Sequence, residues 1–296
     1  MVIRLVLLIF LLVPTARQSL AQDRDFRRQR TQLAVVNVGL SGLVGGLGSA
    51  INKPKGDRFW KAFGRGFYRG AIGGLAHHTG MSMTHLIAKH ETLALAWPAR
   101  LVNSFGASIV QNAAEGRTFF ERLHFNLYIT RLDYYPGDRR LTAKLFTSSI
   151  YGMAVVGRGA QLNIRKSLAS GIFVWESNNN FSNAIADSFA TGQVSSIGMR
   201  LDIPEDSYYD IFAHEAAHIL QYDRKVGGNA LLRHPSERLM ERSRFYQGLS
   251  RFVYFDLNGP LFWVAYRMVG DEHSCNYFEQ EAENYSNRVA YRCINK

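Results

Sequence analysis

The sequence predicts an α+β protein in which a glycine-rich helical region is followed by an antiparallel sheet and then by two helices that share a metal site. Three observations predict this order. Twelve glycines fall between residues 39 and 80, strand-like alternation begins at residue 123, and the motif His214-Glu215-Ala216-Ala217-His218 lies within a well-signalled helix. A chain of 296 residues with 47% hydrophobic and 20% charged residues can bury a substantial core.

The N-terminal residues are typical of an export signal. A short positive end is followed by an apolar run over residues 5–13 and by the small residues Ser19-Leu20-Ala21. We therefore expect cleavage before Gln22 and a periplasmic, outer-membrane-associated or extracellular mature protein. The predicted organisation is a signal peptide (1–21), a glycine-rich helical region (22–117) and an α+β domain (118–296).

The charge balance indicates which partners the exported protein favours. Without the signal peptide, 33 basic and 24 acidic residues remain, a net charge of +9. This excess favours an anionic membrane surface or another acidic polymer. The basic residues are dispersed and match no nucleic-acid motif, so we expect no nucleic-acid partner.

The glycine-rich region predicts closely packed helices. Gly42 and Gly46 have one small-xxx-small spacing, and Gly66, Gly70 and Gly74 have two in succession, which lets helix backbones touch. Residues 33–51 carry no charge and are just long enough to span a bilayer, so insertion is the alternative. Because Arg65 and Arg69 interrupt the second stretch, we favour a helical subdomain packed against the rest of the chain.

The middle of the chain predicts strands. Leu123, Phe125, Leu127 and Ile129 alternate with polar residues, as in a strand with one buried face. A turn is expected at residues 136–138. Further strand-like runs occur at 141–156, 161–165, 171–176 and 194–203. An antiparallel sheet is the simplest arrangement of these segments.

The HExxH motif predicts a metal site on the following helix. Negative charge near residue 206 favours a helix start there, and Gly227-Gly228 favours its end. On such a helix His214 and His218 point in one direction, so both imidazoles can reach one Zn²⁺ ion, and Glu215 lies close to the same position.

A catalytic zinc needs a third protein ligand. The run at 277–285 predicts a second helix with three carboxylates. Its apolar residues define a stripe, and at 100° per residue Glu281 lies nearest to it, Glu279 next and Glu283 farthest. We therefore rank Glu281 first as the ligand and Glu279 second, with Glu283 supporting the site or facing solvent.

These motifs together resemble the gluzincin class of zinc metallopeptidases. HExxHxxQ at 214–221 and ExEAE at 279–283 are similar to the motifs of its small bacterial secreted members, and the resemblance covers residues 194–292. It implies that His214, His218 and Glu281 bind zinc. It also implies that Glu215 is the general base for a metal-activated water attacking the carbonyl of a peptide or protein substrate.

The resemblance leaves three structural details open. If the thermolysin-like spacing of ligand and supporting acid applied, Glu279 and Glu283 would be the pair. The class also implies that a strand at 194–203 lines the cleft, where an edge strand could pair with extended substrate. The group that stabilises the oxyanion stays open among His234, His273, Tyr285 and Arg288.

Two other functions compete with hydrolysis. The protein could be a non-catalytic exported protein in which zinc joins two helices, or a membrane-associated protein whose glycine-rich helices are the working element. Cys275 and Cys293 bracket the second helix. Pairing in an oxidising compartment would require the chain to fold back, because eighteen helical residues span about 27 Å.

Overall fold

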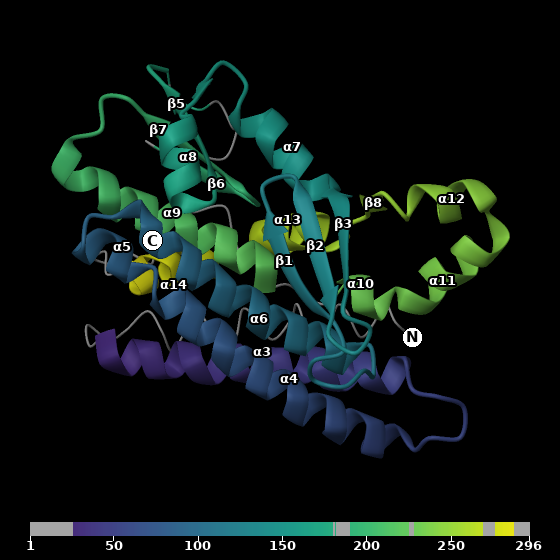
Figure 1. Ribbon diagram of the computed structural model, residues 1–296. Coiled ribbons are helices and arrows are strands. Elements are labelled where there is room, and N and C mark those ends of the chain that lie inside the picture. Colours follow the sequence, from purple (N-terminus) through teal and green to yellow (C-terminus); the bar gives the residue numbers. More distant parts are fainter. Residues whose placement is uncertain (1–25, 180, 182–189, 225–227, 269–275, 287–296) are drawn as a thin grey trace.

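The computed structural model describes residues 26–179, 181, 190–224, 228–268 and 276–286 (Figure 1). The fold is α+β, as predicted. The helices are α3 (Phe26–Ile51), α4 (Phe59–Ser82), α5 (His85–Lys89), α6 (Ala96–Ala114), α7 (Thr147–Val156), α8 (Ile164–Ser170), α9 (Glu205–Arg224), α10 (Gly228–Leu231), α11 (Arg233–Arg242), α12 (Arg244–Leu249), α13 (Asn258–Met268) and α14 (Tyr277–Ser286).

The strands form two mixed four-stranded sheets. They are β1 (Leu123–Leu127), β2 (Thr130–Tyr135), β3 (Arg140–Phe146), β4 (Gln161–Leu162), β5 (Phe173–Ser177), β6 (Ala190–Gln193), β7 (Ser196–Arg200) and β8 (Val253–Tyr254). One sheet has the order β1-β2-β3-β8 and the other β4-β5-β7-β6. A purely antiparallel sheet was expected, but β3 pairs with β8 and β5 with β7 in parallel.

The glycine-rich region forms three packed helices, α3, α4 and α6, as the small-residue spacing predicts. A Cβ atom at Gly66 or Gly70 of α4 would collide with backbone oxygens of α3. The opposing stripe on α3 consists of Asn37, Ser41, Gly45 and Ser49. Gly42 and Gly46 lie outside this stripe and face aromatic rings of α4. Serine and asparagine are small enough to take part in the close helix contact, so the contact does not depend on glycine alone.

Two segments, Arg30–Ile51 and Leu93–Ala114, are long and apolar enough to cross a membrane by length and composition. Half or more of each is buried inside the fold. Core helices of a soluble protein meet the same criteria, so the membrane-span alternative for residues 33–51 stays a prediction.

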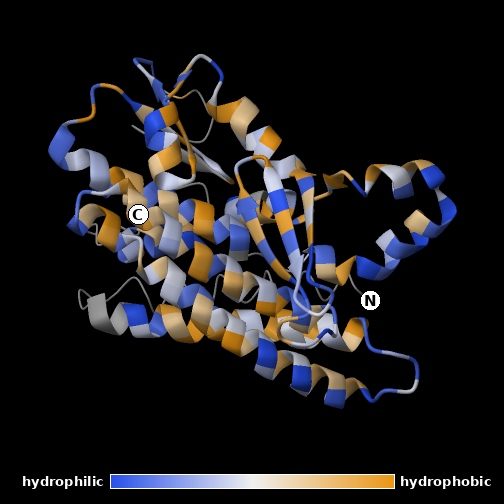
Figure 2. Cartoon of the chain, in the orientation of Figure 1, coloured by the Kyte–Doolittle hydropathy of each residue, from blue (hydrophilic) through white to orange (hydrophobic). Residues whose placement is uncertain are grey.

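The first sheet buries a different face from the one expected. Hydropathy alternates along its strands (Figure 2), but the more deeply buried residues of β1 are His124 and Asn126. Ser108 of α6 accepts a hydrogen bond from the His124 backbone nitrogen, and Asn126 donates to Asp223. These bonds give the polar groups on this side of β1 hydrogen-bond partners inside the protein. The apolar side chains of β1 therefore lie nearer the surface.

Two strand predictions were too long. The run at 141–156 is strand only to Phe146 and continues as α7, and the run at 161–165 ends at Leu162 before α8. In α7 the buried residues include Ser148, Gly152 and Val156, which are four residues apart. This helical spacing was hidden by the high apolar content of the segment.

The segment at 194–203 was expected to be an edge strand. Instead β7 is paired on both sides, by β5 and by β6. Within the described residues the two terminal strands of this sheet are β4 and β6, and β6 packs along α9.

The motif helix α9 lies in the middle of the molecule (Figure 1). It begins at Glu205 and ends at Arg224, close to the predicted limits. One side, including Phe212 and Ala216, packs in the cluster that contains β5 and β7. Another side, including Leu220, packs in the cluster that contains Phe278 and Ala282 of α14. Burial on both sides fixes α9 against α14.

Candidate metal centre

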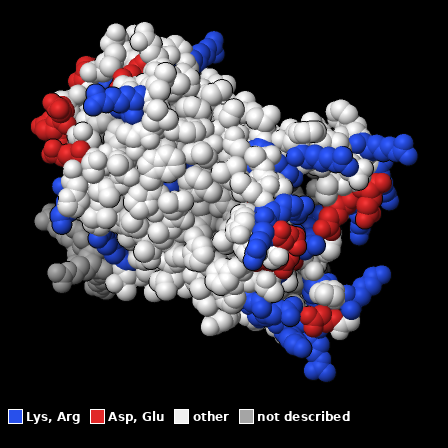
Figure 3. Space-filling view, in the orientation of Figure 1, with Lys and Arg blue, Asp and Glu red and all other residues white. Residues whose placement is uncertain are grey.

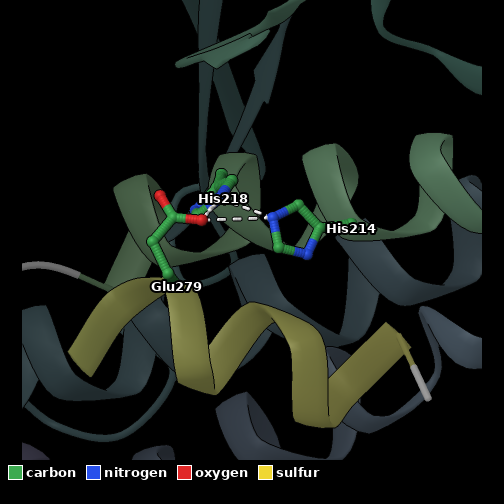
Figure 4. A group of neighbouring side chains, drawn as sticks. All are labelled: His214, His218 and Glu279. Carbon is green, nitrogen blue, oxygen red and sulfur yellow. Dashed lines mark hydrogen bonds and ion pairs between the residues drawn. The ribbon is translucent and has the colours of Figure 1, made fainter. Parts of the chain in front are cut away.

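Three side chains from two helices converge on one point. His214 and His218 project from α9, and Glu279 projects from α14 (Figure 4). Glu279 Oε2 lies 3.2 Å from the Nε2 atom of each histidine, and the two Nε2 atoms are 3.2 Å apart. Tetrahedral ligands at bond lengths of about 2.0–2.1 Å lie about 3.3–3.4 Å from one another. The three atoms therefore fit a single metal ion.

Glu281, the first choice for the third ligand, does not join this group. Its carboxylate accepts a hydrogen bond from Gln221 Nε2 at 3.0 Å, and Glu279 takes the place beside the histidines. The ranking assumed that one stripe of the second helix is buried. In fact every residue of α14 except Gln280 is buried, so the apolar stripe could not indicate which carboxylate faces α9.

Gln221 orients His218 toward the candidate metal position. Its Nε2 donates to Phe278 O at 2.8 Å and to Glu281 Oε2, which leaves Oε1 to accept from His218 Nδ1 at 2.9 Å. A neutral imidazole that donates through Nδ1 presents the lone pair of Nε2. Gln221 is the last residue of the HExxHxxQ motif, although sequence reasoning assigned it no role.

Tyr266 of α13 orients Glu279 and was also missed. Its hydroxyl donates to Glu279 Oε1 at 2.6 Å, and this leaves Oε2 to face the histidines. The only signal for Tyr266 was its position at the end of the apolar stretch 259–266, which predicts burial and no particular contact.

The surroundings concentrate negative charge in a buried place. Burial lowers the pKa of His218, but the charge and hydrogen bond of Glu279, together with Glu215, raise it to about 10. Burial raises the pKa of Tyr266 and Tyr222, and the Glu279 carboxylate raises both further. Buried carboxylates are unfavourable without a compensating charge. The raised pKa of His218 reflects this demand for positive charge, and a divalent cation between the histidines and Glu279 would meet it in place of the proton.

Three of the remaining predicted residues are buried. Glu215 is buried on α9, and its charge contributes to the raised pKa of His218. Glu283 is buried, so it does not face solvent. Tyr285 is committed elsewhere, because its hydroxyl contacts Asn37 Nδ2 at 2.8 Å and His78 Nδ1 at 2.6 Å.

Of the other oxyanion candidates, only His234 lies within the described residues. His234 is exposed on α11, where Nδ1 lies 3.3 Å from Glu237 Oε2. Outside the described residues lie His273, Arg288, the signal peptide and both cysteines.

Comparison with known proteins indicates no family for the chain and no function for this site. The chain matches no protein-family model, no curated protein and no solved structure.

Proposed function

We propose that the protein is an exported zinc-dependent metallopeptidase. The observation that carries the proposal is the triangle of His214 Nε2, His218 Nε2 and Glu279 Oε2, with sides of 3.2 Å, beside the buried Glu215. A buried pair of histidines with a carboxylate is a ligand set of catalytic zinc sites. Bound zinc would supply Lewis acidity, which makes water nucleophilic near neutral pH and polarises a carbonyl.

The protein's own residues then have separate tasks. His214, His218 and Glu279 would hold the metal, while Gln221 and Tyr266 keep two of these ligands in orientation. Glu215 would take a proton from the attacking water and transfer it to the nitrogen of the leaving amine as the C–N bond breaks. The carboxylate is thus regenerated at the end of each cycle.

The sheet edge beside α9 suggests the form of the substrate. β6 is a terminal strand of its sheet within the described residues and packs against the motif helix. An edge strand offers backbone donors and acceptors to an extended chain. This position supports an extended peptide or protein segment as substrate. In this proposal β6, and not the segment 194–203, pairs with the substrate.

A structural zinc site is the second candidate, because all three metal-binding side chains are buried. The number of protein ligands distinguishes the two kinds of site, and a fourth would favour the structural one. Structural zinc sites are almost always closed by four protein ligands, whereas catalytic sites keep three and one open position. Within the described residues the group contains three.

The test compares the purified parent protein with Glu215→Gln. We expect equimolar zinc in both by elemental analysis, and hydrolysis of casein or a peptide library only by the parent. Removing a general base reduces the rate by roughly 100-fold to 10,000-fold. Equal hydrolysis by both proteins would remove Glu215 from the mechanism. Bound zinc without hydrolysis by the parent would favour the structural site, and a folded parent that binds no zinc would exclude both.

A further inference from the structure

The outer surface of α3, α4 and α6 has an unusual charge distribution. Segments 31–52, 70–88 and 92–114 together contain one charged residue, Arg100. That residue is buried, and its guanidinium donates to Gly171 O and Asn126 O. The surface of these three segments therefore carries no Lys, Arg, Asp or Glu side chain.

On α6, several polar residues point inward together with apolar ones, while the exposed residues are apolar. The buried side of α6 includes Arg100, Asn103, Ser104, Ser108 and Asn112. Its exposed residues are Leu101 and Phe105, at 52% and 42%. A surface helix of a soluble protein normally shows the opposite pattern, with its polar face in water.

Exposed apolar side chains lie on both α4 and α6, which pack against each other. On α4 the exposed residues after position 70 include Ile72 and Leu75. On the α6 side, Phe105 stacks on Phe120 with ring centroids 5.9 Å apart. Phe120 adjoins Phe119, over which Arg69 of α4 is placed. Figure 3 shows a broad face without charged side chains in this part of the molecule. Large exposed apolar patches mark contact surfaces.

A basic and aromatic tip borders this apolar layer. Residues 53–65, the α3–α4 tip, project from the body of the molecule (Figure 1). They contain five basic residues and one acidic residue, a net charge of +4. Trp60 is 76% exposed and contacts aromatic rings of its own helix, Phe59 and Phe63. Figure 3 shows Lys and Arg side chains gathered there.

We propose that the outer face of α4 and α6, together with the α3–α4 tip, docks on an anionic lipid bilayer. The charge-free face would contact the acyl chains, and the Lys and Arg side chains of the tip would contact phosphate groups. Trp60 would lie between them, at the depth that tryptophan prefers in bilayers. An anionic bilayer has a hydrocarbon interior next to a layer of negative headgroups. These two layers match the charge-free face and the basic α3–α4 tip.

The test measures binding of the full chain to vesicles of phosphatidylcholine, with and without phosphatidylglycerol, at low and high salt. One variant changes the tip (Lys55→Gln, Arg58→Gln, Lys61→Gln) and another changes the face (Leu75→Gln, Leu101→Gln, Phe105→Gln). The matched control removes similarly exposed residues from α12 and the turn after it (Arg244→Gln, Phe245→Gln, Phe252→Gln). Circular dichroism confirms that each variant is folded.

We expect the parent to prefer vesicles with phosphatidylglycerol and to be released by salt, because salt screens surface charges. The tip variant should bind them roughly 100-fold more weakly, since each Lys or Arg near an anionic surface contributes about fivefold. The face variant should lose binding to both vesicle types, and the control should bind like the parent. Trp60→Phe should remove the blue shift of tryptophan fluorescence on binding.

Three results would overturn the proposal. The first is a parent that does not bind anionic vesicles. The second is a control variant that is impaired as much as the tip and face variants. The third is a face variant that dissociates a dimer in analytical ultracentrifugation while vesicle binding is unchanged, since the surface would then be an interface between two copies of this chain.

Discussion

Single hydrogen bonds determine whether the three atoms of the candidate metal site face one another. Glu279 has two carboxylate oxygens, and the bond from the Tyr266 hydroxyl to Oε1 determines that Oε2 faces the histidines. Loss of such a supporting bond typically weakens metal affinity by about 10-fold to 100-fold. We expect a loss of this size in Tyr266→Phe, measured by competition with a chromogenic chelator. Tyr254→Phe, which removes another buried tyrosine hydroxyl, is the matched control. Unchanged affinity in Tyr266→Phe would show that Glu279 needs no support.

The assignment of the third ligand can be tested with two isosteric changes. Glu279→Gln should weaken zinc binding by more than the roughly 100-fold that loss of a supporting bond costs, because it removes a charged ligand. Glu281→Gln should retain stoichiometric zinc, since the new amide oxygen can still accept from Gln221 Nε2. Elemental analysis after gel filtration distinguishes the two variants. Zinc loss in Glu281→Gln alone would restore the first ranking.

The residue scale also shows where sequence reasoning succeeds. The positions of His214 and His218 follow from the helix repeat alone, so their convergence could be predicted. The choice between Glu279 and Glu281 depends on what surrounds α14 in three dimensions. An amphipathic stripe indicates direction only when one side of a helix is exposed, and α14 is enclosed by other helices.

At the scale of elements, the contact between α3 and α4 depends on the absence of side chains. A Cβ atom at Gly70 would meet the carbonyl oxygen of Ser41 on α3, whereas at Gly64 it would meet no atom within 4 Å. Gly70→Ala should destabilise the protein by about 1–3 kcal/mol through overpacking. Gly64→Ala should stabilise it by roughly 0.5–1 kcal/mol, because alanine is the better helix former. Urea unfolding measures both. Equal effects of the two substitutions would mean that the helices are not in close contact at Gly70.

Helices were easier to predict than sheet topology because helix signals are local in sequence and strand pairing is not. Small-residue spacing and capping signals act within a few residues, and they indicated helices at α3, α4 and α9. The pairing of β5 with β7, in contrast, joins segments that are separated by more than fifteen residues and by β6. No local pattern specifies such a partner, so the expected antiparallel sheet became two mixed ones.

At the scale of the whole molecule, a buried polar cluster joins the helical layer to the first sheet. Glu115, directly after α6, pairs with Arg122 at 2.7 Å, and Arg131 of β2 donates to Gln111 of α6 at 3.0 Å. Burial opposes the charge on Glu115, but Arg122 and Arg117 lower its pKa overall. Stability from this carboxylate is present above its unfolded pKa and is lost as pH falls through the folded pKa. The cluster thus makes the packing of helices on the sheet sensitive to acid.

The same cluster contains a histidine that adds to this sensitivity at higher pH. Burial, and then the charges of Arg131 and Arg122, lower the pKa of His124 well below its ordinary value. Below about pH 6.5 the unfolded chain therefore binds a proton that the folded protein does not, and stability falls by up to about 1.4 kcal/mol per pH unit. We expect the urea midpoint of the parent to decrease from pH 7 to pH 5. His124→Asn, whose amide cannot be protonated, should show a shallower decrease, and His90→Asn at an exposed position should behave like the parent. Equal slopes for His124→Asn and the parent would contradict this prediction. They would show that the folded protein can bind a proton on His124 despite its burial and the nearby arginines.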